Sequence, residues 1–282
     1  MNTNELLRTQ RYFDSHTHLN NSQLYLIRQE LMQQFADHGG VWLVNIGVDG
    51  WYNTLGIEIA QQSKSLFPQL QIGCTVGIHP CKVTDDNMSN ADIDQMVTKI
   101  EQDIQSHHNM IWWIGECGTD LHRPCTPKQH EMQQYATYCQ AKLAQKYKLP
   151  LIIHSRSDRA WTYDVLKDFQ DITINLHCWN YTPAEIQIAL DTWWDHVYFG
   201  FWWILTYPKA WEVRDSLAIT PLSQIVLETD APYLPPQSHR WWENYPHYII
   251  DAYQKASEVL ALDLDILCQQ VEENWKRLYL RN

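Results

Sequence analysis

A segment in the middle of the chain carries the pattern that indicates the fold. Residues 149–155 read LPLIIHS, residues 158–169 read DRAWTYDVLKDF and residues 172–178 read ITINLHC. The first and third stretches are short and rich in branched apolar residues, as in buried strands. The middle stretch has the mixed polar and apolar spacing of a surface helix. The segment therefore predicts two parallel strands joined by a helix.

The same alternation extends along the whole chain. Strand-like runs cover residues 12–19, 41–48, 71–78, 110–117, 149–155, 172–178, 197–204 and 224–229, and helical patterns cover residues 23–38, 53–66, 92–107, 128–148, 158–169, 183–194, 208–217, 248–260 and 263–279. Eight buried strands that alternate with helices favour a closed (β/α)8 TIM barrel over an open sheet. No linker interrupts the pattern, so we expect a single α/β domain over residues 1–282. We expect the proline-rich residues 231–246 to form an ordered loop over one barrel face.

The composition excludes several classes of protein. The 282 residues include 21 Lys and Arg against 33 Asp and Glu, a net charge of −12, which is not the balance of a basic nucleic-acid coat. No run of about 18 apolar residues is present, so we expect no membrane-spanning helix. Residues 1–10 are polar and the seven cysteines lack C-x-x-C spacing, which favours a cytoplasmic protein without a disulfide or zinc framework. Cys117 and Cys178 are interpreted as small buried hydrophobic side chains.

Residue types that bind metals stand at the ends of five predicted strands. In a TIM barrel, these ends and the loops after them build the active site. His16 and His18 are two residues apart on one strand, so both side chains point to the same side. The full set is His16, His18, Glu116, His154, His177 and Asp230. Because imidazole and carboxylate groups are common ligands of divalent cations, this coincidence of place predicts a metal site.

The size of this ligand set indicates how many ions bind. Four imidazoles and two carboxylates exceed what one open catalytic ion requires, but they suffice for two ions that share a carboxylate. Glu116, the only acid at the end of the fourth strand, is the predicted bridge. Two ions of Mg²⁺, Mn²⁺ or Zn²⁺ can activate a water and stabilise the oxygens of a phosphoryl transfer. Asp230 is predicted to hold one ion and to accept the proton of the attacking water, so Glu116 and Asp230 are the predicted catalytic residues.

Several short motifs follow one another along nearly the whole chain. They are FDSHTHLN (residues 13–20), NIGVD (45–49), VGIHP (76–80), IGECGTD (114–120), LPLIIHSRSD (149–158), NLHC (175–178), YFGF (198–201), IVLETDAPYL (225–234) and NWKRLY (274–279). In this order the set resembles the TatD family of metal-dependent deoxyribonucleases. The resemblance implies a TIM-barrel hydrolase of the amidohydrolase superfamily that cuts DNA phosphodiesters with divalent metal, often as an exonuclease. The family's metal ligands fall on the six residues that stand at the strand ends.

The chain departs from the usual family pattern around the site. The departures are Thr119 and Leu121 on either side of Asp120, Trp179 and Asn180 after Cys178, and Glu243 in place of the arginine that commonly stands beside Asn244. Only Arg240 lies near that last position. We therefore expect an intact metal centre whose surrounding wall differs from that of the family.

Further residues are predicted to contact substrate. They are His79, His122, Arg156, Trp179 and Arg240. His79 contacts the substrate or a metal-bound water, or it only packs. Arg156 meets a phosphate through two hydrogen bonds, or it forms a surface ion pair. His122, with its neighbour Arg123, binds phosphate or forms an exposed loop pair.

Two other interpretations concern positioning and stacking. Glu228 lies two residues before Asp230 and orients a ligand histidine, or it is the buried partner of an arginine in the barrel. Trp179 and either Trp241 or Trp242 lie on loops at the site face, where an indole ring can stack on a nucleobase or pack within a lid.

The leading hypothesis is a divalent-metal-dependent hydrolase with DNA as its substrate. We expect an exonuclease acting on single strands or ends, because a duplex carries its scissile bonds outside a narrow barrel mouth. A second hypothesis is an amidohydrolase-type enzyme acting on a small ester, lactone or amide, and a third is a noncatalytic metal-binding protein. Glu116 disfavours the second, since related deaminases lack this acid and other binuclear members use a modified lysine as bridge. We expect a monomer without an obligate protein partner.

Overall fold

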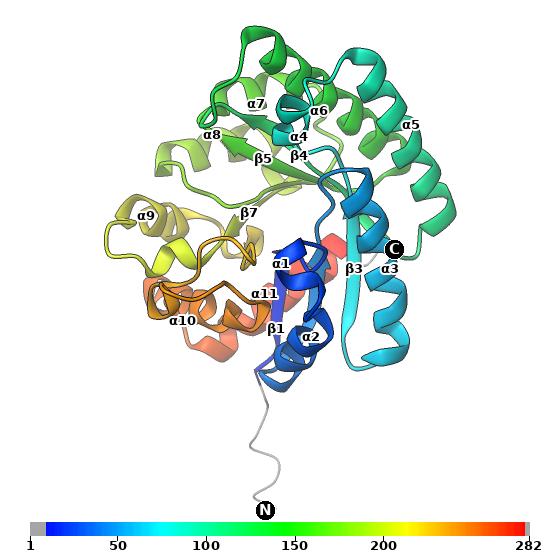
Figure 1. Ribbon diagram of the computed structural model, residues 1–282. Helices are drawn as coiled ribbons and strands as arrows, with labels where there is room; N and C mark the ends of the chain where they lie inside the picture. Colours follow the sequence, from blue (N-terminus) through cyan, green and yellow to red (C-terminus); the bar gives the residue numbers. More distant parts are fainter. Residues whose placement is uncertain (1–9, 280–282) are drawn as a thin grey trace, which may run out of the picture.

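Eight parallel strands stand in chain order, each paired with the next, and helices surround them (Figure 1). The computed structural model describes residues 10–279. The strands are β1 (Tyr12–Thr17), β2 (Gly40–Asn45), β3 (Gln71–Val76), β4 (Ile111–Asp120), β5 (Leu151–Arg156), β6 (Ile174–Leu176), β7 (Val197–Phe201) and β8 (Ile225–Leu227). The predicted (β/α)8 TIM barrel is confirmed.

The helices cover the outer face of this barrel, and some of them begin at a capping side chain. They are α1 (Ser22–Tyr25), α2 (Arg28–Asp37), α3 (Gly50–Leu66), α4 (Pro80–Asp85), α5 (Asn90–His107), α6 (Pro127–Tyr147), α7 (Arg159–Leu166), α8 (Pro183–Trp193), α9 (Trp211–Ile219), α10 (Ile249–Leu260) and α11 (Leu264–Tyr279). Ser89 with Asp92 caps α5, and Thr126 with Gln129 caps α6, each satisfying backbone N–H groups of the first turn. Among residues 10–279, no helix is both long and apolar enough to cross a membrane.

The barrel closes between β1 and the segment that follows β8. Thr17 pairs with Ala231 in a parallel bridge, and the N–H of Asp230 donates to the carbonyl of His16 at 2.8 Å. The buried carboxylate of Asp14 strengthens this seam, since it accepts hydrogen bonds from both the N–H and the hydroxyl of Thr229. Closure therefore brings the first and last predicted ligands of the chain side by side.

Several predicted element bounds are wrong. The single helix expected over residues 23–38 is two helices, α1 and α2, and α4 was not predicted at all. Six of the eight expected strands end earlier than predicted, and β6, β7 and β8 end before His177, Trp202 and Glu228. These residues stand just beyond the regular strands, although the N–H of His177 still donates to the carbonyl of Ile153 at 3.2 Å and that of Glu228 to the carbonyl of Phe201 at 3.0 Å.

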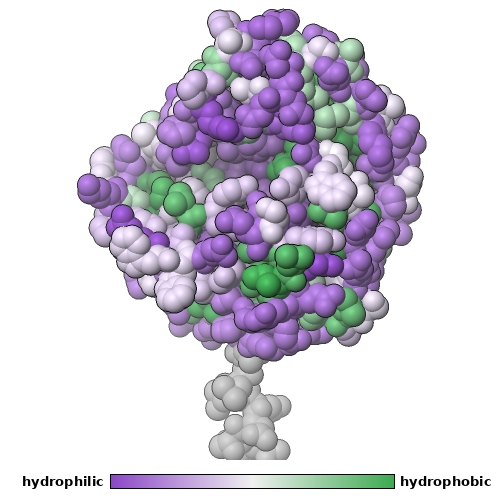
Figure 2. Space-filling model, in the orientation of Figure 1, coloured by the Kyte–Doolittle hydropathy of each residue, from purple (hydrophilic) through white to green (hydrophobic). Residues whose placement is uncertain are grey.

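The loop over residues 231–246 is ordered, as predicted. The fully buried side chain of Asn244 donates to the carbonyls of Thr229, Tyr233 and Leu234 at 2.7, 2.9 and 3.3 Å. One amide group thus ties the end of the loop to its beginning. On the face drawn in Figure 2, hydrophilic residues prevail and hydrophobic ones form small scattered groups.

The outer core depends on large aromatic side chains. Trp275 on α11 is fully buried, and its ring lies 5.5 Å from that of Phe13 on β1 and 5.7 Å from that of Trp42 on β2. Trp275 therefore fixes the last helix against the strands of the closing seam.

Replacing this indole should destabilise the barrel. We expect Trp275→Ala to lower the free energy of unfolding by about 3–5 kcal/mol, because truncation of a large buried side chain leaves a cavity. Trp241→Ala is the matched control, since Trp241 is 87% exposed, and its effect should stay within about 0.5 kcal/mol. Urea unfolding followed by circular dichroism measures both, and equal effects would contradict the assigned role of Trp275.

Candidate metal centre

A cavity of about 840 Å³ opens at the carboxyl ends of the strands. Its lining includes His18, His79, Glu116, Asp120, His154, Arg156, His177, Cys178, Trp202, Asp230 and Tyr233. Of the predicted ligands, five line this cavity, and His16 lies fully buried behind it. The structure thus brings all six predicted ligands together.

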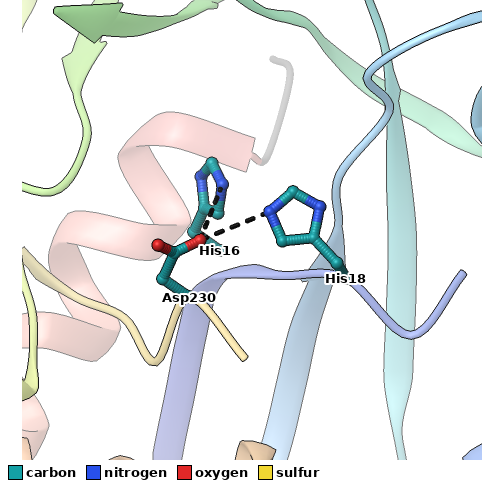
Figure 3. A group of neighbouring side chains, drawn as sticks. All are labelled: His16, His18 and Asp230. Carbon is teal, nitrogen blue, oxygen red and sulfur yellow. Dashed lines mark ion pairs between the residues drawn. The ribbon is translucent and has the colours of Figure 1, made fainter. Parts of the chain in front are cut away.

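One group of ligand atoms lies at the closing seam (Figure 3). Asp230 Oδ1 is 3.6 Å from His16 Nε2 and 3.3 Å from His18 Nε2. These three residues offer donor atoms that all lie within 4.8 Å of one another. The alternation of β1 explains the pair of imidazoles on one side, and barrel closure supplies the carboxylate.

Glu116 stands at the centre of the site. Its Oε2 lies 3.7 Å from His16 Nε2, 3.0 Å from His177 Nε2 and 3.7 Å from His154 Nδ1. Its Oε1 lies 3.8 Å from His18 Nε2. A single buried carboxylate therefore contacts ligand imidazoles of both β1 and the neighbouring strands β5 and β6, as a bridging ligand must.

The second group of ligand atoms lies on the far side of Glu116. His154 Nδ1 is 3.2 Å from His177 Nε2, so both imidazoles converge on one point. The other nitrogen of His154, Nε2, lies 3.2 Å from the carboxylate of Asp120 at the end of β4. Asp120 therefore orients the His154 ring by holding the nitrogen that does not face Glu116.

The site holds an ionised carboxylate among imidazoles whose pKa values are shifted in opposite directions. Burial by itself would raise the pKa of Glu116, but the imidazoles of His79, His177 and His16 hold it well below its usual range. Burial, reinforced by the neighbouring imidazole of His177, lowers the pKa of His16. Glu116 is thus ionised and His16 is neutral, which are the forms in which both residues bind metal. Burial alone would lower the pKa of His177, but the neighbouring carboxylate of Glu116 raises it, so this imidazole must give up a proton when it binds an ion.

Some buried polar atoms of the site have no hydrogen-bond partner among the described residues. Within residues 10–279, His16 Nε2 and Glu116 Oε2 are buried and have no hydrogen-bond partner. An unsatisfied buried polar group costs about 1–3 kcal/mol, so such atoms are retained where something else satisfies them. Buried imidazole nitrogens and carboxylate oxygens that converge without partners fit divalent cations.

Glu228 lies directly behind the ligands. Its carboxylate is fully buried, 3.5 Å from His177 Nδ1 and 3.1 Å from the hydroxyl of Ser15, and it accepts the N–H of Cys178. Glu228 thus lies beside a predicted ligand histidine, and among the described residues it has no arginine partner, which favours the first of its two predicted roles.

Three predicted contacts with substrate differ in their surroundings. His79 caps α4, where its Nδ1 accepts the N–H of Cys81 at 3.0 Å. The proton of the neutral ring is therefore on Nε2, which lies 3.9 Å from Glu116 Oε1. Arg156 lines the cavity and has no ion-pair partner in the described part of the chain. His122 is exposed, and it is not one of the described residues that line the cavity.

The predicted stacking surface at Trp179 is wrong. Its side chain is 2% exposed and packs edge-on against Phe199 and Tyr181 inside the protein. Arg240 instead stacks on the exposed ring of Trp241, and of the residues that the structure describes neither belongs to the cavity lining. The sequence around Trp179 and Arg240 indicates that both residues lie on loops. It does not indicate whether each side chain points into the cavity, into the core or toward solvent.

The structure adds residues to the site that sequence reasoning missed. Asp120 holds His154, Lys82 lines the cavity as a cation, and Trp202 lines it as an aromatic surface, whereas Arg123, which the sequence had already indicated beside His122, lines it as well. A signal existed for Asp120, because it lies four residues after Glu116 and such residues share one face of a strand. Lys82 gave no signal, since it lies on α4, which was not predicted.

A (β/α)8 barrel with converging histidines and carboxylates at its carboxyl end is the architecture of a metal-dependent hydrolase. The model of the family described as TatD related DNase matches residues 13–280, so the chain belongs to this family and is a metal-dependent hydrolase acting on ester bonds. The resemblance found in the sequence is thereby confirmed.

Similar proteins span the same length. An uncharacterized metal-dependent hydrolase of Mycoplasma pneumoniae is 27% identical over 95% of this chain and 99% of its own. The 3'-5' ssDNA/RNA exonuclease TatD of Pantoea ananatis is 25% identical over 95% of this chain and 98% of its own. The crystal structure of YjjV, a TatD homolog from Escherichia coli K12, superimposes with a TM-score of 0.85 at 22% identity, covering 97% of this chain and 100% of that one. At this identity the last likeness shows the fold alone.

Removing the carboxylate behind His154 should weaken metal binding. We expect Asp120→Asn to reduce the affinity for Mn²⁺ about 10–100-fold, because the partner that orients a ligand imidazole is lost. Isothermal titration calorimetry on metal-free protein measures the change. Asp85→Asn is the control, since Asp85 lies on the same wall but pairs with Arg123 at 3.2 Å. If both variants bound Mn²⁺ like the wild type, Asp120 would have no positioning role.

Proposed function

We propose that the protein is a nuclease that hydrolyses phosphodiester bonds of single-stranded DNA from an end, with two divalent cations. The observation that carries the proposal is the position of Glu116, whose two carboxylate oxygens lie within 3.9 Å of imidazoles from β1, β5 and β6 and of His79. The name of the relative from Pantoea ananatis, a 3'-5' ssDNA/RNA exonuclease, supports the same substrate class.

The proposed ligands divide into two sets that share one carboxylate. His16, His18 and Asp230 hold one cation, His154 and His177 hold the other, and Glu116 belongs to both. When bound, the two cations activate water and stabilise negative charge on phosphate oxygens. Asp120 and Glu228 keep the rings of His154 and His177 turned toward the centre.

Asp230 is the proposed proton acceptor. Its side chain is 12% exposed and lines the cavity, whereas His16 is entirely enclosed. A water that attacks phosphorus from the cavity comes within hydrogen-bond reach of this carboxylate, which is the geometric requirement of a general base. The His79 ring, which carries its proton on Nε2, is placed to donate to a phosphate oxygen beside Glu116.

The cavity walls fit a nucleotide with a phosphate on one side and a base on the other. Lys82, Arg123 and Arg156 form a cationic wall, and Arg156 is the one without an ion-pair partner among the described residues. A guanidinium group suits phosphate because it donates two parallel hydrogen bonds. Trp202 and Tyr233 form an aromatic wall, on which a base can stack for about 1–3 kcal/mol.

Loss of either proposed ligand set should abolish hydrolysis. We expect Glu116→Ala and His154→Ala to reduce cleavage of end-labelled single-stranded DNA at least 1,000-fold with Mg²⁺ or Mn²⁺, a loss of about 4 kcal/mol of transition-state stabilisation. Glu131→Ala, an exposed residue of α6, is the control that should cleave normally. Cleavage that survived both site substitutions would disprove the assignment of the centre.

The substrate class needs a separate comparison. The purified protein should be assayed on DNA, RNA, an aryl phosphodiester and a lactone under identical metal conditions. Preference for a phosphodiester supports the proposal, and preference for the lactone would favour a small-molecule hydrolase instead.

The unpaired guanidinium predicts a binding effect. We expect Arg156→Ala to raise KM for single-stranded DNA about tenfold, roughly 1.4 kcal/mol, with a smaller change in kcat, because the lost contact is made before and during the reaction. Arg156→Lys should restore part of the affinity. Steady-state kinetics over a series of DNA concentrations measure the two constants, and an unchanged KM would place Arg156 outside the binding site.

A further inference from the structure

A thiol lies in the metal centre beside the proposed ligands. Cys178 follows His177 just after β6, and its backbone has a φ of +50°. In a regular strand, neighbouring residues face opposite sides, but this left-handed residue turns the chain, so that His177 and Cys178 both line the cavity. Cys117 is fully buried, as predicted, whereas Cys178 is only partly buried and lines the cavity.

The backbone on both sides holds this thiol in place. The N–H of Cys178 donates to Glu228, and the N–H of Trp179 donates to the carbonyl of Gly200 at 2.8 Å. Glu228 can approach only because Gly200 lacks a side chain, since a Cβ there would overlap the carboxylate. The direction of the Cys178 side chain is therefore set by the packing of β6 against β7 and β8.

The donor atoms around the thiol have the spacing of ligands to one ion. Cys178 Sγ lies 3.4 Å from Asp230 Oδ2, and His177, Cys178 and Asp230 offer donor atoms within 4.8 Å of one another. Sulfur and oxygen ligands of one tetrahedral Zn²⁺ lie roughly 3.5 Å apart, given bond lengths of about 2.3 and 2.0 Å. On the other side of Asp230, His16 Nε2 is buried and has no hydrogen-bond partner within residues 10–279. That imidazole nitrogen independently indicates a place for a cation.

We propose that Cys178 Sγ is a ligand for thiophilic divalent cations, such as Zn²⁺ and Cd²⁺, on the His177–Asp230 side of the centre. As the bond between sulfur and metal forms, the S–H bond breaks and its proton passes to solvent. Thiolate ligands bind zinc strongly, whereas Mg²⁺ prefers oxygen ligands. The centre therefore offers Zn²⁺ or Cd²⁺ one more ligand atom, the sulfur of Cys178, than it offers Mg²⁺.

A sulfur ligand also affects activity, and this part of the inference rests on the proposed hydrolysis. A catalytic ion needs an open position for water, and a closed set of protein ligands is the mark of a structural site. An ion held by sulfur fills a position that water must occupy. Excess Zn²⁺ therefore inhibits hydrolysis supported by Mn²⁺, and loss of the thiol relieves the inhibition.

Ultraviolet absorption of the cadmium complex tests the ligand directly. Metal-free protein is titrated with Cd²⁺, and sulfur-to-cadmium charge transfer is recorded as a difference spectrum. We expect the band in the wild type at the first equivalents and its loss in both Cys178→Ser and Cys178→Ala. Serine keeps the size of the side chain and a hydrogen bond to Asp230, so this variant removes only the sulfur.

Cys81→Ser is the matched control, because Cys81 lines the same cavity, lies 4.0 Å from a carboxylate oxygen of Asp120 and, among the described residues, belongs to no group of converging ligand atoms. This variant should keep the band. Absence of the band from the wild type, or an equal band in Cys178→Ser, would overturn the proposal.

A second measurement follows activity. The Zn²⁺ concentration that halves Mn²⁺-supported cleavage should rise at least tenfold in Cys178→Ser, and an unchanged value would count against inhibition through sulfur. If the wild type cleaved no DNA, that result would count against the proposed function alone, since the absorption experiment needs no substrate.

Discussion

The site depends on closure of the barrel between its first and last strands. His16 and His18 come from β1, whereas Asp230 lies more than 200 residues later, yet Asp230 Oδ1 lies within 3.6 Å of both imidazoles. The buried Asp14 carboxylate and the Thr229 side chain hold this seam together, and Trp275 packs behind it against Phe13. A change that opened the seam would separate the ligands even if every ligand residue remained.

Burial of so many ionisable groups is tolerated because they compensate one another. An isolated buried carboxylate would take up a proton, but the imidazoles around Glu116 keep its pKa well below its usual range. In turn, the outer nitrogen of His154 lies 3.2 Å from the carboxylate of Asp120, and that of His177 lies 3.5 Å from the carboxylate of Glu228. The ligands are therefore oriented before any ion arrives, which reduces the cost of organising the site when it binds.

The walls of the cavity differ from the centre in how they are built. The predicted ligands stand at or just beyond strand ends, where the pairing of the barrel positions them, and the cations and aromatic rings around them stand on loops and short helices, except Arg156 at the end of β5. In this division the six predicted ligands belong to the barrel, and the segments that depart from the usual family pattern belong to its walls. On the proposed function, contacts with substrate fall to residues such as Arg156 and Trp202, and metal binding falls to the strand ends.

Local sequence by itself determined the number and order of the strands and indicated the six residues that the structure brings together as predicted ligands. Both follow from short-range rules, since burial on two faces selects apolar runs, and a position at a strand end faces the mouth of the barrel. Only the tertiary structure decided that Trp179 turns inward, that Arg240 stacks on Trp241 outside the cavity, and that Cys178 faces the ligands. These outcomes depend on contacts with residues far along the chain, such as the packing of Glu228 against Gly200 and the backbone of Cys178. No pattern within a single segment contains those contacts, because they exist only after the strands have assembled.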